Sequence, residues 1–595
     1  MKKYIIPFAV LMAVGFASCD DSLDLEPKDR VSEADYFKTE KDLELFTNPY
    51  YNNIITKDAF NMSSDLMLIQ NLPNELLGGT FRSVPSKTNA ASGWDWVDLR
   101  RINSLLARVD RCPDQAAVVK YTALSRMFRA YFYFDKVVRF GDVPWFDVEI
   151  GSADVELLYK PRDSRELVMT KMIEDIDYAI ANLPDHKSQA NMPYRATKWA
   201  AMALKAQFCL FEGTYRKYHG LNLEGHDYKY YLEQSAAAAK ELITTGPYKI
   251  WSSGNPNSDY RELFRAENAN SDEYILAIKY DGTIGTFHDA YGFSFTSARG
   301  MPGLPRKFVN MYLMKDGSRF TDKQNWKEQT YAEEIKDRDP RLTQSIRFPG
   351  CVFNGKAALP NLAESVTGYN PIKFVQDGIT RNDYCTCDLP VFRIAEVMLN
   401  YAEARAELGT LTQDDLDMTV NKIRDRVNMP HLIMSVANSN PDWYLASAEY
   451  GYPNVDGANK GVILEIRRER AIELNQEGFR WADIRRWKAG NCYNQEITGM
   501  YFPGPGEYDL DGDGNADIVL YSEGQSKPNV DGAQVYLIGS EVKLTDGDKG
   551  YVNYHRDINR TAFNEGRDYL YPIPSDQLAL YKDRGYVLEQ NPGWN

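Results

Sequence analysis

The sequence predicts a mainly α-helical protein, built as an irregular helical-repeat scaffold with long loops and a few short strands. Amphipathic segments with the 3.6-residue period of a helix occupy much of residues 96–246 and 393–490. Small residues at the expected helix contacts, as in the Ala-rich run 197–213, favour closely packed antiparallel helix pairs. No strict 34-residue period is present, so the repeats are expected to be irregular.

Individual helices are expected where apolar periodicity is bounded by capping or breaking residues. The first is expected at 42–55, after a polar tether. Others are expected at 96–109, 115–140, 164–183, 197–213, 231–244, 393–408 and 414–427, with two more inside 461–490. Residues 60–96, 248–388 and 491–568 are predicted to be rich in loops, with a short strand at 273–280 and an aromatic, Gly-rich loop at 287–303. Residues 569–595 form a closing segment punctuated by Pro.

The helical segment 461–490 carries charged residues on its apolar face. An unpaired buried charge is strongly unfavourable, so carboxylates or carbonyls elsewhere in the fold must meet these side chains. We therefore interpret the segment as a structural ion-pair network that holds helices together. The residues that share this face are Ile463, Ile466, Arg467, Arg470, Leu474 and Glu477.

Charge and composition limit the classes of partner. The 595-residue chain has a formal net charge of -15, so nucleic acid is not an expected partner. Aromatic residues make up 13% of the chain, including 39 Tyr and 10 Trp. These side chains combine a flat apolar face with a polar edge, which suits stacking on sugar rings as well as ordinary core packing.

The first residues have the pattern of an export signal. Lys2 and Lys3 precede an apolar run, residues 4–16, that is too short to span a bilayer. The run ends in Ala17-Ser18-Cys19, which looks like a bacterial lipoprotein signal. We expect residues 1–18 to be the signal peptide, Cys19 to be lipidated, 19–36 to form a tether, and 37–595 to form a single domain. The alternative is a plain secretory signal with a Cys nearby by chance.

The remaining cysteines show no dense disulfide framework, although export permits disulfides. Cys385 and Cys387 could form a strained disulfide or half of a metal site. Because no His lies nearby in the sequence, we favour ordinary loop cysteines.

Several separated segments together resemble the SusD/RagB family of Bacteroidetes outer-membrane lipoproteins. They are 141–144 (GDVP) after an aromatic helix, 393–404 (RIAEVMLNYAEA), 423–426 (IRDR), 467–487, 571–574 (YPIP) and 590–593 (QNPG). They follow the family order and extend over essentially the whole chain.

The resemblance implies tetratricopeptide-like helix pairs with long loops that carry a ligand site. It also implies non-catalytic binding of oligosaccharides and delivery to a SusC-like TonB-dependent transporter, over which the protein acts as a lid. The same lid could instead bind peptides or another nutrient, or serve as a purely structural partner of the transporter. The acidic residues after Cys19 resemble a signal for the cell surface, so the implied location is the outer membrane, lipid-anchored and facing the exterior.

Candidate ligand residues are aromatic and guanidinium side chains in predicted loops, because sugars are bound by stacking and by hydrogen bonds to hydroxyls. Trp94 is the favoured stacking platform, whereas Trp96, which is nearer the helix, is expected to belong to the core. The predicted set is Arg82, Trp94, Trp96, Tyr291, Phe293 and Trp326.

The strongest chemical motif is an acidic loop that resembles the first part of a calcium-binding loop. Position 12 is Leu520 instead of the bidentate Glu, so a structural calcium site is expected and not a complete EF-hand. The alternative is an Asp-Gly-rich surface turn. The predicted ligands are Asp509, Asp511, Asp513, Asn515 and Asp517.

No enzymatic activity and no organic cofactor are expected. The sequence has no H-E-x-x-H, G-x-S-x-G or phosphate-loop motif. A glycosidase needs two carboxylates across the scissile bond, but Glu469 and Glu473 are more simply partners of the neighbouring arginines.

Overall fold

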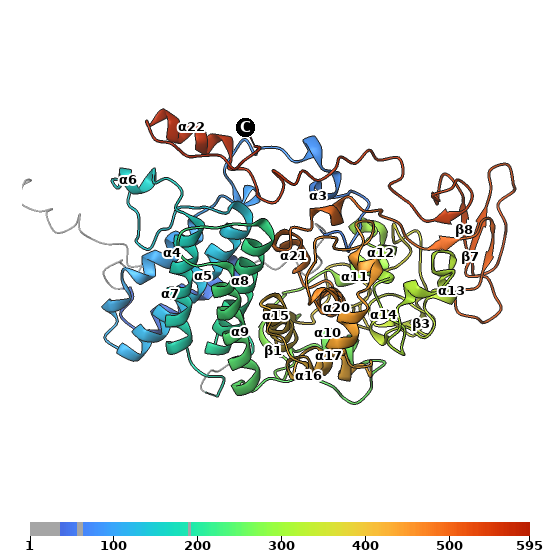
Figure 1. Ribbon diagram of the computed structural model, residues 1–595, viewed down its shortest axis with the longest axis horizontal. Coiled ribbons are helices and arrows are strands. Elements are labelled where there is room, and N and C mark those ends of the chain that lie inside the picture. Colours follow the sequence, from blue (N-terminus) through green and yellow to red (C-terminus); the bar gives the residue numbers. More distant parts are fainter. Residues whose placement is uncertain (1–35, 56–63, 188–191, 595) are drawn as a thin grey trace, which may run out of the picture.

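The computed structural model describes residues 36–55, 64–187 and 192–594, and it confirms the predicted mainly helical fold (Figure 1). Most long helices gather on one side of the molecule, whereas most of the short helices and strands lie toward the other side. The predicted signal peptide, Cys19 and nearly all of the tether lie outside the described residues. Within those residues, no helix is both long and apolar enough to cross a membrane.

The scaffold consists of helices that pack mainly in neighbouring pairs. Helix α8 (Lys198–His219) packs on α9 (Tyr228–Thr245), and α5 (Gln115–Phe140) packs on α7 (Arg165–Asn182). Helix α15 (Ile394–Glu407) contacts both α9 and α20 (Lys460–Glu473). At Gly213 a Cβ would come within 2.7 Å of Leu232, so the absence of a side chain allows α8 and α9 to approach closely. The scaffold helices are α2 (Glu40–Asn53), α4 (Val97–Leu106), α5 (Gln115–Phe140), α7 (Arg165–Asn182), α8 (Lys198–His219), α9 (Tyr228–Thr245), α15 (Ile394–Glu407), α17 (Val420–Arg426), α20 (Lys460–Glu473) and α21 (Arg480–Arg486).

Local sequence signals explain the bounds of helix α5, which agree with the prediction. The Asp114 side chain accepts hydrogen bonds from the backbone N–H groups of Ala116 (3.0 Å) and Ala117 (3.2 Å), which caps the first turn. Gly141 ends the helix with φ of 74°, a backbone conformation that favours glycine.

The connecting regions hold short helices. They are α3 (Asn74–Leu77), α6 (Val155–Leu158), α10 (Asp259–Arg265), α11 (Ala290–Phe295), α12 (Arg306–Val309), α13 (Tyr331–Glu334), α14 (Pro340–Thr343), α16 (Gln413–Asp417), α18 (Met434–Ser439), α19 (Trp443–Ala446) and α22 (Ser575–Asp583). Two predictions are corrected here. The single helix expected at 414–427 is interrupted at Thr419, whose φ and ψ of -128° and -93° are not helical, and the loop expected at 287–303 contains α11.

Short strands form four small sheets. Strand β1 (Tyr274–Ile278) pairs antiparallel with β4 (Leu389–Arg393), and β2 (Val352–Phe353) pairs with β3 (Lys356–Ala357). Strand β5 (Tyr501–Phe502) pairs antiparallel with β9 (Gly550–Tyr551). In the remaining sheet β7 (Ile518–Tyr521) lies between antiparallel β6 (Gly506–Tyr508) and parallel β8 (Gln534–Leu537). The region after residue 490, predicted as loops, therefore holds most of the strands.

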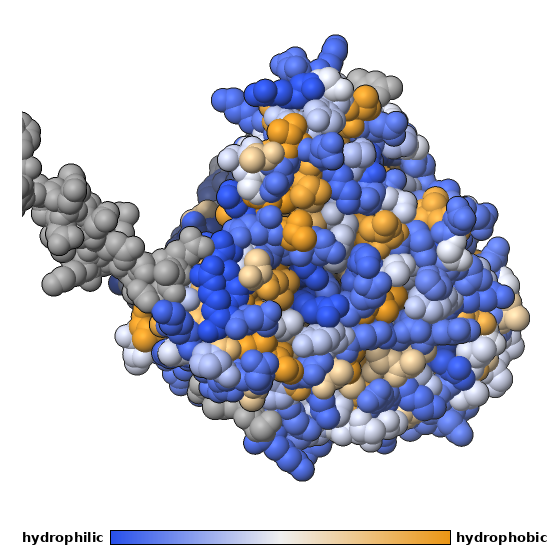
Figure 2. Space-filling view, turned by 90° about the vertical axis from the view of Figure 1, so that its left-hand side faces the viewer, coloured by the Kyte–Doolittle hydropathy of each residue, from blue (hydrophilic) through white to orange (hydrophobic). Residues whose placement is uncertain are grey.

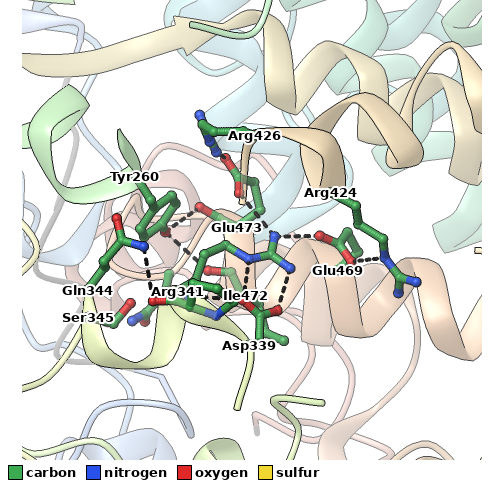
Figure 3. A network of polar contacts seen from close by, with 12 residues as sticks. Tyr260, Asp339, Arg341, Gln344, Ser345, Arg424, Arg426, Glu469, Ile472 and Glu473 are labelled. Atoms are coloured by element: carbon green, nitrogen blue, oxygen red, sulfur yellow. Dashed lines mark hydrogen bonds and ion pairs between the residues drawn. The ribbon is translucent and has the colours of Figure 1, made fainter. Parts of the chain in front are cut away.

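The structure confirms the ion-pair network predicted around helix α20. Glu473 is fully buried, and its carboxylate lies 2.8 Å from Arg393 and 3.2 Å from Arg341 and also contacts Arg426. Figure 3 shows Arg341 and Arg426, from different segments of the chain, beside Glu473. Burial alone would raise the pKa of Glu473, but the three guanidinium groups together hold it well below its usual range.

The network extends along both sides of Glu473. Glu469 contacts Arg341 and lies 2.9 Å from Arg424, while Glu477 lies 2.7 Å from both Arg393 and Lys373. Glu469 and Glu473 thus each form ion pairs with buried arginines, as the sequence indicated. Buried cations and buried carboxylates are nearly equal in number, so the interior is close to neutral.

The network continues into α21, because Arg470 of α20 lies 2.8 Å from Asp483 of α21 and also donates to Asn400 at 2.7 Å. Arg467 uses a partner that the sequence did not indicate. Its buried guanidinium lies 4.4 Å from the Trp487 ring centre and 3.6 Å from the Glu407 carboxylate.

All six cysteines of the described residues are free and buried. Cys385 and Cys387 therefore form no disulfide, which agrees with the favoured interpretation. The fold nevertheless brings His288 to Cys387, with Nε2 3.2 Å from Sγ, although these residues are distant in sequence. Burial lowers the pKa of His288 to about 4.

Candidate functional site

The six predicted ligand residues do not come together in one place. Trp94 and Trp326 belong to the main hydrophobic core, whereas Tyr291 packs on a second core cluster. Each location is best judged by whether it offers an accessible aromatic face beside polar groups, because that combination is what sugar recognition requires.

Arg82 lies in a structural position. It is 6% exposed and donates a hydrogen bond to the Asp568 carbonyl oxygen at 2.8 Å. Its guanidinium lies 5.4 Å from the Tyr571 ring centre and 5.6 Å from that of Trp594. These contacts attach the loop that carries Arg82 to the closing segment of the chain.

Trp94 and Trp96 line a groove of about 310 Å³ beside α4, α6 and α22. The expected order of their exposure is reversed, because Trp94 is 2% exposed and packed edge-on against Phe140, while Trp96 is partly exposed. Aliphatic side chains such as Val148 and Leu158 form much of the remaining wall. Figure 2, which views this end of the molecule, shows apolar side chains set among hydrophilic ones. The buried Trp94 ring offers no open face for stacking.

Tyr291 and Phe293 lie on the short helix α11 and are partly buried. The Tyr291 ring stacks on Phe295 at 5.6 Å, and Phe295 stacks on Phe353 at 4.1 Å. The Arg347 guanidinium also lies 4.0 Å from the Phe295 ring centre. The faces of these rings are therefore largely covered by one another and by Arg347.

Trp326 lies beneath an aromatic surface that better fits the requirement. Trp326 itself is 8% exposed, but Trp443, whose ring centre is 6.1 Å away, is 44% exposed. Tyr450 is partly buried and meets Trp326 edge-on at 5.8 Å. Lys327 is exposed, and its Nζ lies 5.4 Å from the Trp326 ring and 6.0 Å from the Tyr450 ring.

Two tyrosines from the small sheet complete this surface. Tyr501 on β5 and Tyr551 on β9 are directly paired in register, and both are partly exposed, with ring centres 5.6 Å apart. The Tyr551 hydroxyl donates to the Lys327 carbonyl oxygen at 2.8 Å, which fixes the sheet against the segment that carries Trp326. Glu496 interacts electrostatically with Tyr450 and Lys327. We call the group Lys327, Trp443, Tyr450, Glu496, Tyr501 and Tyr551 the aromatic–carboxylate site.

The buried ion-pair network positions the exposed indole of this site. Asp442 caps the short helix α19 by accepting from the Leu445 N–H at 3.0 Å. The same carboxylate contacts Arg468 of α20 and lies 3.4 Å from Arg319. Trp443, the next residue, is therefore attached to the scaffold through its neighbour, and its Nε1–H donates to Asp322 at 3.0 Å.

Carboxylates give the site an acidic character. Partial burial raises the pKa of Glu496, and the nearby carboxylates of Glu449 and Asp546 raise it further. The pKa of Tyr450 is also raised, first by burial and then by the charges of Glu449 and Glu496 among others. Carboxylates, an ammonium group and accessible aromatic faces thus meet at one surface, a combination suited to polyhydroxylated ligands.

The acidic loop brings together three of its five predicted calcium ligands. One carboxylate oxygen from each of Asp509, Asp511 and Asp517 lies within 4.8 Å of the others. Asp513 instead accepts hydrogen bonds from the backbone (2.7 Å) and side-chain (3.1 Å) nitrogens of Asn515. Burial and the three neighbouring aspartates raise the pKa of Asp517, as expected where like charges are crowded.

Comparison with known proteins decides the family. The sequence model of the SusD family matches residues 272–594. The chain belongs to the SusD family. SusD-like protein P38 of Formosa agariphila is 24% identical over 536 residues, covering 82% of this chain and 92% of the relative. A SusD-like protein of Bacteroides ovatus is 25% identical over 564 residues, covering 86% and 90%.

Solved SusD-like structures share the fold. A SusD-like carbohydrate binding protein from Bacteroides fragilis superposes with a TM-score of 0.67 at 20% identity, covering 91% of this chain and 98% of that one. A laminarin binding SusD-like protein gives a TM-score of 0.54 at 18% identity, covering 93% and 100%. The SusD-family match covers residues 272–594, so it includes every residue of the aromatic–carboxylate site and Trp326 beneath it.

The sequence indicated Trp326, which lies beneath this surface, as a ligand residue, but it did not indicate Trp443, Tyr450, Tyr501 or Tyr551. The Tyr-rich character of the region after residue 490 was a usable signal. It was not decisive, because the approach of three segments distant in sequence is a property of the fold.

Proposed function

We propose that this SusD-family protein binds oligosaccharides without chemical conversion, and that the aromatic–carboxylate site contacts the sugar. The observation that carries the proposal is the meeting of exposed Trp443 and partly exposed Tyr450, Tyr501 and Tyr551 with Glu496 and Lys327 in a chain of this family. The carbohydrate binding of its structural neighbours supports the proposal. Binding of peptides or another nutrient is the alternative for the same surface.

The test is calorimetric titration with a panel of neutral oligosaccharides and peptides. Trp443→Ala should weaken binding of the best sugar about tenfold, because it removes one accessible stacking face. Phe81→Ala is the matched control, since Phe81 is also an exposed aromatic, at 53%, but lies outside the site. Binding of no sugar by the wild-type protein, or equal binding by both variants, would refute the proposal.

We also propose that the bound sugar is delivered to a SusC-like TonB-dependent transporter by a protein anchored through Cys19 in the outer membrane and facing the exterior. The lipoprotein-like pattern before Cys19 and membership of the SusD family support this proposal. A purely structural partner of the transporter would form the same complex without affinity for sugars. Calorimetry on the isolated protein distinguishes the two.

We further propose a structural calcium ion at the acidic loop. The convergence of Asp509, Asp511 and Asp517 supports it, because calcium prefers several carboxylate oxygens. The ion would neutralise the crowded carboxylates and stabilise the connection between β6 and β7.

A further inference from the structure

A second open groove is lined by cationic side chains, in contrast to the acidic loop and the aromatic–carboxylate site. It has a volume of about 680 Å³, within the range of small-molecule sites. Its walls come from the end of α2, residues 192–195, and β1 with the residue that follows it. Its lining includes Arg195 and Lys279, and among the described residues that line it there is no Asp or Glu.

Arg195, which lines this groove, is held in position by its neighbours. Its Nη1 donates to Asn48 Oδ1 at 2.7 Å, and its guanidinium lies 5.0 Å from the Tyr51 ring centre. The Tyr51 hydroxyl accepts from the Ala196 N–H at 3.0 Å, which fixes the ring. Such contacts reduce the conformational entropy that an arginine would otherwise lose when it binds a ligand.

The charge of Arg195 acts on the carboxylate of Glu44, but no carboxylate lies within ion-pair distance of it in the described part of the chain. The structure gives no ion pair within 4.0 Å for it there, whereas nearby Lys41 and Lys120 are paired with Glu44 and Glu40 at 2.8 Å and 3.0 Å. Lys279 is 47% exposed and lies 3.4 Å from Asp281, so it is only loosely paired. The cationic lining of this groove contrasts with the net charge of -15 of the whole chain. A groove lined by one sign of charge concentrates ligands of the opposite sign.

The other groups of the groove fit a sugar better than a simple ion. Tyr51 and Tyr194 supply partly buried rings, and Asn48 and Asn52 supply side-chain amides for hydroxyl groups. Arginine binds planar carboxylates and sulfate-like oxyanions through paired N–H donors, and lysine adds a point charge.

We propose that this groove is a second binding site, which takes a saccharide unit bearing an anionic carboxylate or sulfate group. Arg195 and Lys279 bind the anionic group, while Tyr51 and Tyr194 contact the ring. The site goes beyond the proposed binding at the aromatic–carboxylate site, whose acidic residues disfavour an anionic sugar.

The test compares three probes by calorimetry: a neutral galacto-oligosaccharide, an oligogalacturonate and a sulfated galacto-oligosaccharide of similar length. Wild-type protein should bind at least one anionic probe at least tenfold more tightly than the neutral probe, and the arm that binds identifies carboxylate or sulfate. The double variant Arg195→Gln, Lys279→Gln should lose at least tenfold affinity for that probe, and added salt should weaken wild-type binding. Lys422→Gln removes one charge from an exposed lysine outside the groove and should bind as the wild type.

Lys279→Glu provides a second variant if the double variant is unstable, because Lys279 is exposed and its reversal should not disturb the core. Trp443→Ala should leave binding of the anionic probe unchanged. The proposal is overturned if no anionic probe binds more tightly than the neutral one, or if the Arg195 and Lys279 variants bind it normally. It is also overturned if Trp443→Ala abolishes this binding and the groove variants do not. Failure of neutral sugars to bind would count against the proposed function alone.

Discussion

The substitution Glu473→Gln should destabilise the protein far more than the small change in side-chain structure suggests. The substitution keeps the shape and hydrogen-bonding capacity of the side chain but removes the charge. Glu473 is fully buried, and its carboxylate contacts Arg341, Arg393 and Arg426. After the substitution these guanidinium groups keep their other carboxylate partners, but the cluster has lost one of the negative charges that balanced them.

Breaking a buried ion pair by removing one partner costs about 3–5 kcal/mol, because the remaining charge stays desolvated. For a protein of this size, which unfolds with an entropy on the order of 1 kcal/mol per kelvin, this corresponds to a melting temperature about 3 °C lower. Glu174→Gln is the matched control. Glu174 also pairs with a cation, Lys171 at 2.8 Å, but its side chain is 51% exposed, so the loss should be below about 1 kcal/mol.

The pH dependence provides an independent check on the mechanism. The pKa of Glu473 is lowered in the folded protein, so its contribution to stability is fully present above the unfolded pKa of about 4.3. The contribution is lost as pH falls from there toward the folded pKa. Urea unfolding followed by circular dichroism should therefore show a gap between wild type and Glu473→Gln that narrows below about pH 4. Equal stability of the two proteins at pH 7, or a gap that widens in acid, would refute this reasoning.

Two further predictions concern the acidic loop and the N-terminus. Calcium at 100 times its Kd should raise the melting temperature of metal-stripped protein by about 2 °C. Asp511→Ala should abolish this rise, whereas the control Asp531→Ala, at an exposed position outside the loop, should not. Absence of any rise in the wild-type protein would exclude the site. The effect should weaken in acid, since protons compete for Asp517, whose pKa is raised. Wild-type cells should incorporate labelled palmitate into the protein and Cys19→Ser cells should not; equal labelling would contradict lipidation at Cys19.

The long elements of the fold could be predicted because their signals are local. Helix α5 has an Asp cap, a long apolar period and a terminating Gly, and its observed bounds match the prediction. The charged face of α20 was also informative, since buried guanidinium groups require partners wherever those partners come from. The short strands β5 and β9 were missed because two residues are too few to display a period, and their pairing depends on a partner far away in the chain.

The candidate site was harder to predict for a related reason. Trp94 and Trp443 have similar local contexts, each beside polar residues near a helix start, yet one is 2% and the other 44% exposed. Their exposure depends on which other segments cover them. Likewise, Arg195 was given no role from the sequence, because its place in the groove and its lack of an ion pair within 4.0 Å appear only when all described neighbours are placed around it.

The balance of charge within the core has a consequence for how these molecules meet each other. Because buried cations and carboxylates nearly cancel, the acidic excess of the chain resides on its surface or in segments outside the described residues. Copies held close together should therefore repel one another over roughly one Debye length, about 8 Å at physiological ionic strength. This repulsion would keep a crowded population dispersed without any dedicated spacer.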